Sequence, residues 1–221
     1  MYSRPNILDF PRKLSLSSAL TGLSACFLFV LICVTSFTVS GIQLAKGQRD
    51  ILPNASAFGS RSSLYVNSIE GFSVRYPVDW EKVEFAPGIS EGPRNTIVNF
   101  VSPSRGLSDL FREYLIIETV NLTSNHQSAD SFAAGEIQYL KQSFPGFNLI
   151  QLMASTNATS YPAHEIEYAY ADPIAGNDKA LEVWLVKDAK AYALSYHAAA
   201  QEFSSYLPIV RMMIDSFTIT G

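Results

Sequence analysis

The chain has 221 residues, of which 48% are hydrophobic and only 16% are charged. A domain usually takes about 100 to 200 residues, so this length holds one medium-sized domain and a membrane segment but excludes a second domain. Residues 1–50 carry five cations and two anions, whereas residues 51–221 carry eleven cations and eighteen anions. An acidic domain behind a basic stem argues against nucleic acid as a partner, because phosphates require clustered Lys and Arg.

A long uncharged run lies near the N-terminus. No charged side chain occurs in residues 14–45, and the middle of this stretch is almost continuously apolar or small. A helix rises about 1.5 Å per residue, so about 20 such residues cross a hydrocarbon core roughly 30 Å thick. The run predicts a transmembrane helix over residues 19–42, in contact with the lipid bilayer, after a short N-terminus of residues 1–18.

The charges around this run predict its orientation. Three cations and one anion precede it, while two cations and one anion follow it closely. Segments rich in Lys and Arg tend to stay in the cytoplasm, so the bias favours a cytoplasmic N-terminus and an extracellular C-terminal domain. We therefore expect a single-pass protein of the cell membrane.

Two other interpretations of the run remain open. A signal peptide could end at the small residues 39–41, although the apolar run is longer than the usual signal-peptide core of about 7 to 15 residues. A lipoprotein signal would use residues 23–26, which resemble the sequence in which a Cys becomes lipidated, but strongly apolar residues follow that Cys. An uncleaved anchor fits the length of the run best.

Both cysteines of the chain, Cys26 and Cys33, lie inside the uncharged run. The domain that follows has none, so it can form neither a disulfide nor a thiolate metal site. A spacing of seven places the two thiols on one helical face, where they could meet a neighbouring helix. Small apolar fillers in a lipid-facing helix are the simpler interpretation.

The composition then separates a stalk from a domain. Residues 43–62 mix Gly, Ser, Asn and Pro without periodicity, which is typical of a flexible stalk, and residues 63–221 form the domain. Gly71 between two alternating segments predicts a β-hairpin over residues 65–76, which Pro77 ends. Alternation and β-branched residues predict further strands at residues 96–101 and 114–121. Short polar turns favour an antiparallel arrangement of four more strands, at residues 148–155, 163–170, 181–187 and 191–198.

Two helices are also expected. The first covers residues 130–144, with Ser128 or Asp130 as its N-cap and Pro145 directly after its end. The second covers residues 201–217, where apolar side chains recur every three or four residues, and we expect it to break or restart at Pro208. Helices beside an antiparallel sheet predict an α+β fold.

Three motifs, in this order, resemble the PsbP-like family. Residues 71–80 read GFSVRYPVDW, residues 191–196 read AYALSY and residues 213–217 read MIDSF. The resemblance covers about residues 63–220. The pattern GF-x-x-x-YP-x-x-W in the first motif is the most specific, and it fits a turn glycine followed by alternating core residues and a strand-ending proline.

The resemblance implies an α-β-α sandwich with a central antiparallel sheet, here behind an N-terminal transmembrane helix, and no catalytic machinery. The family's namesake is an extrinsic lumenal subunit that helps photosystem II retain calcium and chloride. This chain has an apolar anchor where that subunit has a plastid transit peptide, so we expect no photosynthetic role.

The sequence contains no compact catalytic or metal motif. His126, His164 and His197 are spread over a loop and two strands, and a hydrogen-bonded or exposed histidine is the simplest interpretation of each. Strand alternation points His164 away from Glu165 and Glu167. There is no nucleophile elbow, no S-x-x-K motif and no Gly-rich phosphate loop, so we expect no catalytic residue and no enzyme activity.

Oxygen ligands for a hard cation are the remaining chemical possibility. Two groups carry them, namely Glu165, Glu167 and Glu182 on facing strand surfaces, and Asp172, Asn177 and Asp178 in one loop. Calcium takes several such ligands, but the spacing lacks the EF-hand register. We expect no cofactor, and weak calcium binding stays as an alternative that the family resemblance suggests.

Asn54, Asn121 and Asn157 each begin an N-x-S/T sequon. The sequons are compatible with glycosylation of a domain outside the cell. About two would arise by chance in a chain this rich in Ser and Thr, so they support the topology only slightly.

These observations predict a non-enzymatic, membrane-anchored module, displayed outside the cell, that binds or scaffolds another envelope protein or complex. The alternative is a module that binds a small ligand or a calcium-type metal ion. An exposed apolar patch would be the structural sign of the first.

Overall fold

The computed structural model describes residues 58, 61–86, 94–107, 109, 111–122, 128–156, 161–172 and 176–220. The chain divides into two compact units, residues 1–42 and residues 43–221, and every described residue belongs to the second. The predicted transmembrane helix at residues 19–42 therefore lies outside the described residues, together with both cysteines. None of the described helices combines the length and the apolar character that crossing a membrane requires.

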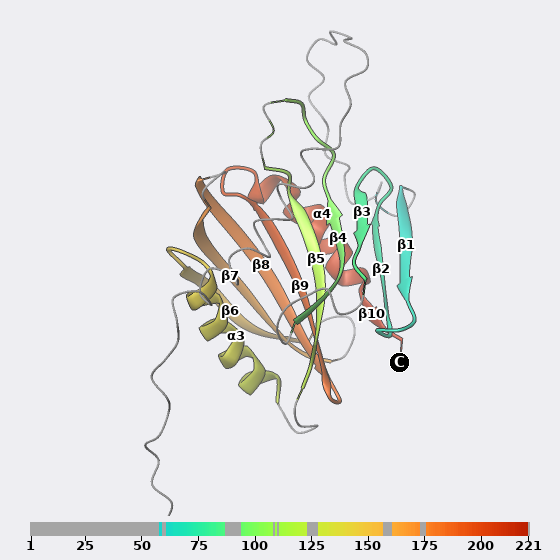
Figure 1. Cartoon of the computed structure of the whole chain (residues 1–221), viewed down its shortest axis with the longest axis vertical. Helices are drawn as coiled ribbons and strands as arrows, with labels where there is room; N and C mark the ends of the chain where they lie inside the picture. Colours follow the sequence, from blue (N-terminus) through green and yellow to red (C-terminus); the bar gives the residue numbers. More distant parts are fainter. Residues whose placement is uncertain are drawn as a thin grey trace, which may run out of the picture. The chain divides into compact units, whose positions relative to one another are not determined.

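A seven-stranded antiparallel sheet forms the centre of the second unit (Figure 1). Its strand order is β3-β4-β5-β9-β8-β7-β6. The strands are β3 (Glu81–Glu84), β4 (Arg94–Val101), β5 (Tyr114–Asn121), β6 (Asn148–Thr156), β7 (Pro162–Asp172), β8 (Gly176–Lys187) and β9 (Lys190–Ala199). Because β5 pairs with β9, the two halves of the sheet are joined by strands that lie far apart in the sequence.

A smaller sheet of three strands, β1 (Ser62–Asn67), β2 (Phe72–Pro77) and β10 (Thr218–Ile219), lies beside the β3 end of the large one. The predicted hairpin is confirmed, since β1 and β2 pair through a turn in which Gly71 has a φ of 75°. The Tyr65 hydroxyl donates to Glu84 of β3, which connects the small sheet to the large one.

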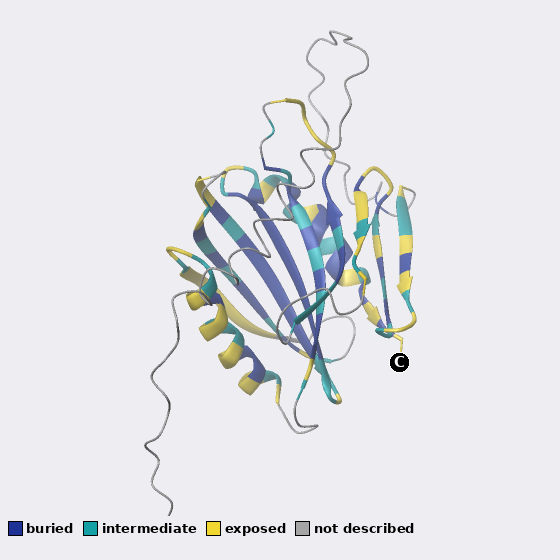
Figure 2. Cartoon of the chain, in the orientation of Figure 1, coloured by how far each residue is buried: buried dark blue, intermediate teal, exposed yellow. Residues whose placement is uncertain are grey.

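Within the described ranges the helices α3 (Ala129–Ser143) and α4 (Phe203–Ser216) cover opposite faces of the large sheet. Alternate residues of β9 demonstrate this, because Tyr192 and Leu194 belong to the core under α4, whereas Ala191 and Ala193 belong to the core under α3. Figure 2 shows the central strands as almost wholly buried between these layers. The chain therefore has an α+β fold with helix, sheet and helix in three layers.

The sequence-based elements differ from the structure at four places. Strands β3 and β10 were not predicted, and β8 begins at Gly176, five residues before the predicted start at 181. The second helix does not break at Pro208, which lies on its exposed side. The early start of β8 is explained by its pairing with β7. This pairing holds the polar residues at the start of β8 in the sheet, although they have little strand preference of their own.

Candidate functional site

Two of the three histidines lie in the described part of the chain, and both are engaged internally; His126 lies outside it. His164 Nε2 is 2.8 Å from Asp130 Oδ1 at the start of α3. His197 is buried, and its Nδ1 shares a 2.9 Å hydrogen bond with the Tyr170 hydroxyl. Burial lowers the pKa of His197 to about 3, with the nearby Arg94 as a second cause, so this imidazole is neutral at physiological pH.

Glu165 and Glu167 point to the α4 side of the sheet. Glu165 pairs with Arg211 of α4 at 2.6 Å, and Glu167 pairs with Lys179 of β8 at 2.6 Å. His164 contacts α3 on the other side, so the three side chains do not converge.

The expectation that Glu182 faces these two glutamates is wrong. Glu182 pairs in register with Ile166 and lies on the α3 side, because neighbouring residues of a strand point to opposite faces. Its carboxylate is 2% exposed and accepts hydrogen bonds from the Tyr168 hydroxyl at 2.7 Å and from Trp184 Nε1 at 2.8 Å. Burial raises the pKa of Glu182, and the positive Arg94 opposes that rise.

The acidic loop of residues 171–178 is divided between two strands. Asp172 ends β7, whereas Asn177 and Asp178 lie in β8. Asp178 shares a face with its cross-strand neighbour Tyr170, and Asn177 points to the opposite face. Among the described residues no group of three or more His, Cys, Asp or Glu is placed to hold a metal ion.

Asp178 is the most unusual of these carboxylates. It is fully buried, and neither of its oxygens has a hydrogen-bond partner, since the Tyr170 hydroxyl is directed to His197. Burial raises the pKa of Asp178 to about 7, and the negative charge of Asp172 contributes. The group is therefore close to half protonated at neutral pH.

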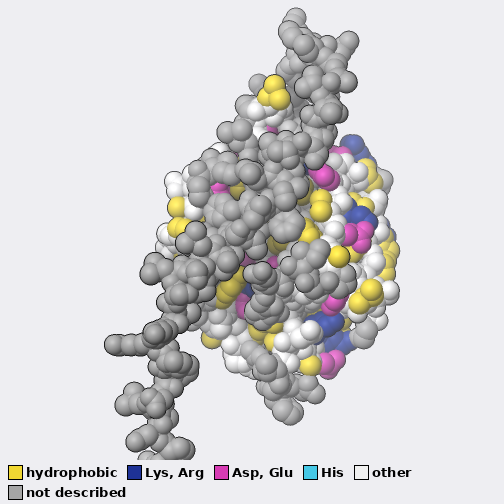
Figure 3. Space-filling model, viewed as in Figure 1, with side chains coloured by type: hydrophobic (Ala, Val, Ile, Leu, Met, Phe, Trp, Pro, Cys, Tyr) yellow, Lys and Arg dark blue, Asp and Glu magenta, His cyan; other side chains and the backbone are white. Residues whose placement is uncertain are grey.

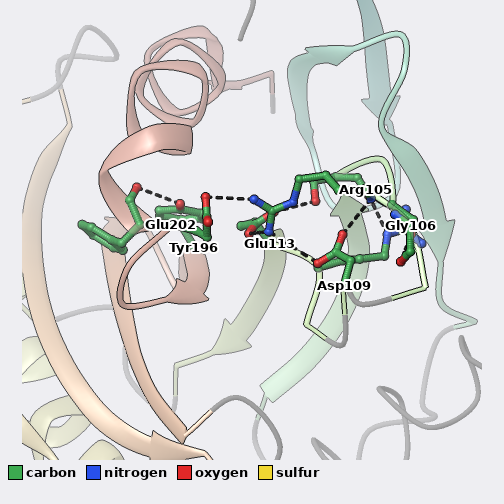
Figure 4. Close-up of polar contacts among 10 residues, drawn as sticks. Arg105, Gly106, Asp109, Glu113, Tyr196 and Glu202 are labelled. Carbon is green, nitrogen blue, oxygen red and sulfur yellow. Dashed lines mark hydrogen bonds and ion pairs between the residues drawn. The ribbon is translucent and has the colours of Figure 1, made fainter. Parts of the chain in front are cut away.

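A cluster around Arg105 joins the β4–β5 loop to the start of α4 (Figure 4). The Arg105 guanidinium lies 3.2 Å from Glu113 Oε1 and 2.9 Å from Glu202 Oε2, and its backbone N–H donates to Asp109. Glu113 is fully buried and also accepts a hydrogen bond from the Ser102 hydroxyl. Every carboxylate of this cluster is paired, so it acts as a structural clamp.

The exposed large hydrophobic side chains form two groups rather than a random scatter. Ten such residues are exposed in the described part of the chain, and eight of them belong to the two groups. The first group is on β6 and comprises Leu149, Ile150, Leu152 and Met153, which are 40–47% exposed. The second belongs to the β1–β2 hairpin and its flank and comprises Leu64, Val66, Ile69 and Val78.

Strand β6 is an edge of the large sheet, because it pairs with β7 on one side and with no described strand on the other. Its nine residues include no charged side chain and no proline. An unpaired edge of this kind presents a row of backbone N–H and C=O groups that can pair with another strand. The opposite edge strand, β3, has four residues, of which Glu81, Lys82 and Glu84 carry charges that protect it.

Side chains on both faces of β6 would contact an added strand. Leu149 and Leu152 stand opposite Tyr168 and Ile166 and so lie on the α3 side. Met153 stands opposite Glu165 on the α4 side. The strand itself was predicted from the sequence, but its position at an edge could not be, because strand order depends on pairing between distant segments.

Comparison with solved structures finds the same fold in several proteins of low sequence identity. Cyanobacterial PsbP (CyanoP) from Synechocystis sp. PCC 6803 has a TM-score of 0.51 and 16% identity, covering 83% of this chain and 98% of its own. LpqN from Mycobacterium tuberculosis has a TM-score of 0.51 and 15% identity, covering 72% and 86%. The yeast Ran-binding protein Mog1p has a TM-score of 0.43 and 9% identity, covering 72% and 95%.

No protein-family model and no curated protein matches the sequence. At these identities the structural similarities to CyanoP and LpqN show the fold alone, which is PsbP-like. The expected PsbP-like architecture is thus confirmed as a fold.

Proposed function

We propose that the protein is a non-enzymatic module, anchored in the cell membrane by residues 19–42, whose extracytoplasmic domain binds another envelope protein. The binding surface is the free edge of β6. The observation that carries this proposal is a nine-residue, uncharged edge strand with four exposed large hydrophobic side chains.

Strand addition is the recognition mode that such an edge supports. An extended segment of the partner would pair its backbone with β6, while its alternating side chains meet those of β6 on the two faces. Leu149 and Leu152 would contact apolar partner side chains on the α3 face, and Met153 would do so on the other. The partner therefore offers an extended segment with apolar residues at alternating positions.

Two further observations support the proposal. The described acidic and basic groups are mostly committed to internal ion pairs, such as the Arg105 clamp, which leaves little polar machinery for catalysis. LpqN, which shares the fold, is named as a protein involved in cell envelope biogenesis, the compartment proposed for this domain.

A site-specific photocrosslinker at position 152 of the full-length protein, in the native membrane, tests the surface. We expect crosslinking to a second protein, and we expect Leu152→Lys to reduce the yield of a crosslink from position 149 at least tenfold, because a charge on the edge opposes strand pairing. Amide hydrogen exchange of β6 should slow in the complex and should not slow with Leu152→Lys.

Leu107→Lys is the matched control, because Leu107 on the β4–β5 loop is also exposed and lies away from β6. It should leave the crosslink unchanged. Equal loss in both variants, or no loss with Leu152→Lys, would contradict binding at the edge. Extraction of the full-length protein from membranes by alkaline carbonate would contradict the anchor.

A further inference from the structure

The β1–β2 hairpin carries the second group of exposed hydrophobic side chains. Leu64 and Val66 on β1 are 54% and 57% exposed, whereas Tyr65 between them is 6% exposed. Alternation therefore gives the hairpin an inner face, which packs on the core, and an outer face. Ile69 in the turn is 79% exposed and Val78 just after β2 is 55% exposed.

This outer face is apolar and bordered by basic side chains. Arg75 stands opposite Leu64 in the β1–β2 register, and Arg61 precedes β1. Both arginines are exposed and neither forms an ion pair within the described ranges. Two acids adjoin the face: Asp79 follows Val78, and Glu70, which pairs with Lys190, follows Ile69. Seven other cations of the domain do form ion pairs: Lys82, Arg94, Arg105, Arg112, Lys179, Lys190 and Arg211.

The hairpin is also the first described sheet element after the proposed anchor. Phe58 is 7% exposed and belongs to the core under α4, so residues 43–57 connect the end of the predicted span to the domain. A flexible linker of this length would have an average end-to-end distance of about 21 Å and a fully extended reach of about 50 Å. The membrane surface is therefore within reach of the hairpin at a high effective concentration.

We propose that the outer face of the β1–β2 hairpin rests on a bilayer that contains anionic phospholipid. Leu64, Val66 and Ile69 enter the boundary between headgroups and acyl chains, and Arg61 and Arg75 contact lipid phosphates. Insertion of the apolar side chains provides most of the free energy of binding to the membrane. The domain as a whole is acidic, so only the basic rim of this face attracts anionic lipid. The inference rests on the membrane anchor of the proposed function.

The contact would orient the domain for partner binding. The hairpin lies beside β3, at one end of the seven-stranded sheet, and β6 is at the other end (Figure 1). Six strand spacings of about 4.8 Å separate β3 from β6, a distance of roughly 29 Å. Figure 3 shows hydrophobic side chains among charged ones on the side where β1 and β2 lie.

The test uses the full-length chain with Cys26→Ser and Cys33→Ser, reconstituted in phosphatidylcholine vesicles with or without phosphatidylglycerol. A single cysteine introduced by Ile69→Cys carries an environment-sensitive fluorophore, and Leu107→Cys provides the matched exposed position. We expect a blue-shifted label at position 69 that aqueous iodide quenches several-fold more weakly than the label at position 107. Phosphatidylglycerol should increase this protection, and Arg75→Glu should remove the increase.

Equal quenching at the two positions, in a chain that resists carbonate extraction, would overturn the hairpin contact and leave the anchor intact. Protection that persists in detergent or rises with protein concentration would indicate a protein contact and would also overturn it. A chain that carbonate extracts would refute the anchor, and the hairpin contact would fall with it. The label and the extraction therefore separate the two proposals.

Discussion

At the scale of single residues, the burial of Asp178 makes the stability of the fold depend on pH. Its carboxylate is fully buried without a hydrogen-bond partner, and burial raises its pKa from 3.8 to about 7. The carboxyl group of Asp178 binds its proton more tightly in the folded state than in the unfolded state. The stability that this proton binding contributes is therefore complete below about pH 4, and it is lost as the pH rises through about 7. Above neutral pH the fold holds a buried negative charge, which only the neighbouring Tyr170 hydroxyl offsets in part.

Asp178→Asn removes that charge without changing the shape of the side chain. We expect the variant to be more stable than the wild type by about 1–3 kcal/mol at about pH 8, and the difference to shrink as the pH falls and to vanish below about pH 4. Urea unfolding of the full-length protein in detergent across this range measures the effect. Parallel stability curves for wild type and Asp178→Asn would contradict the prediction.

At the scale of elements, α4 contains a proline, Pro208, at which we expected the helix to break or restart, and the helix continues through it. Pro208 is the sixth residue of the helix and lies on its exposed side, so the helix continues without the hydrogen bond that an N–H there would donate. Burial of six side chains on the inner side outweighs this loss: Phe203, Tyr206, Ile209, Val210, Met213 and Ile214.

Pro208→Ala should therefore stabilise the protein. Alanine restores the backbone donor and the helix propensity, while part of that gain is offset because the unfolded chain becomes more flexible. We expect a net increase of about 1–2 kcal/mol in the free energy of unfolding, measured with denaturant. Ser204→Ala, another exposed position of α4, should give less than half of that gain, and destabilisation by Pro208→Ala would mean that the core requires a bend there.

Local signals in the sequence predict an element well when its own residues carry the preference. The strand predicted at residues 148–155 ends within one residue of the observed β6, whereas the four residues of β3 are mostly charged and gave no strand signal. Neither the free edge of β6 nor the outer face of the hairpin could be predicted, because both depend on strand order. Glu182 was misplaced for a related reason, since its face follows from the register with Ile166.

At the scale of the whole domain, one sheet is shared by two hydrophobic cores. The core under α4 includes Trp80 and Ile214, and the core under α3 includes Leu140 and Trp184. Strands β8 and β9 contribute alternate residues to both. Loss of one core exposes the sheet that supports the other, so the described domain should unfold as one cooperative unit.

The two tryptophans of the chain make this cooperativity measurable. In a Trp80→Phe background, the fluorescence of Trp184 reports on the α3 side alone, because each core contains one tryptophan. Ile214→Ala, a change in the opposite core, should lower the free energy of unfolding by about 2–5 kcal/mol and shift the Trp184 transition together with the far-UV circular dichroism. Leu140→Ala, on the side of Trp184, should shift both signals in the same way. A Trp184 transition that stays in place with Ile214→Ala would mean that the two layers unfold independently and that α4 is a detachable cover, which would leave the α3 side of the sheet, including β6, folded without it.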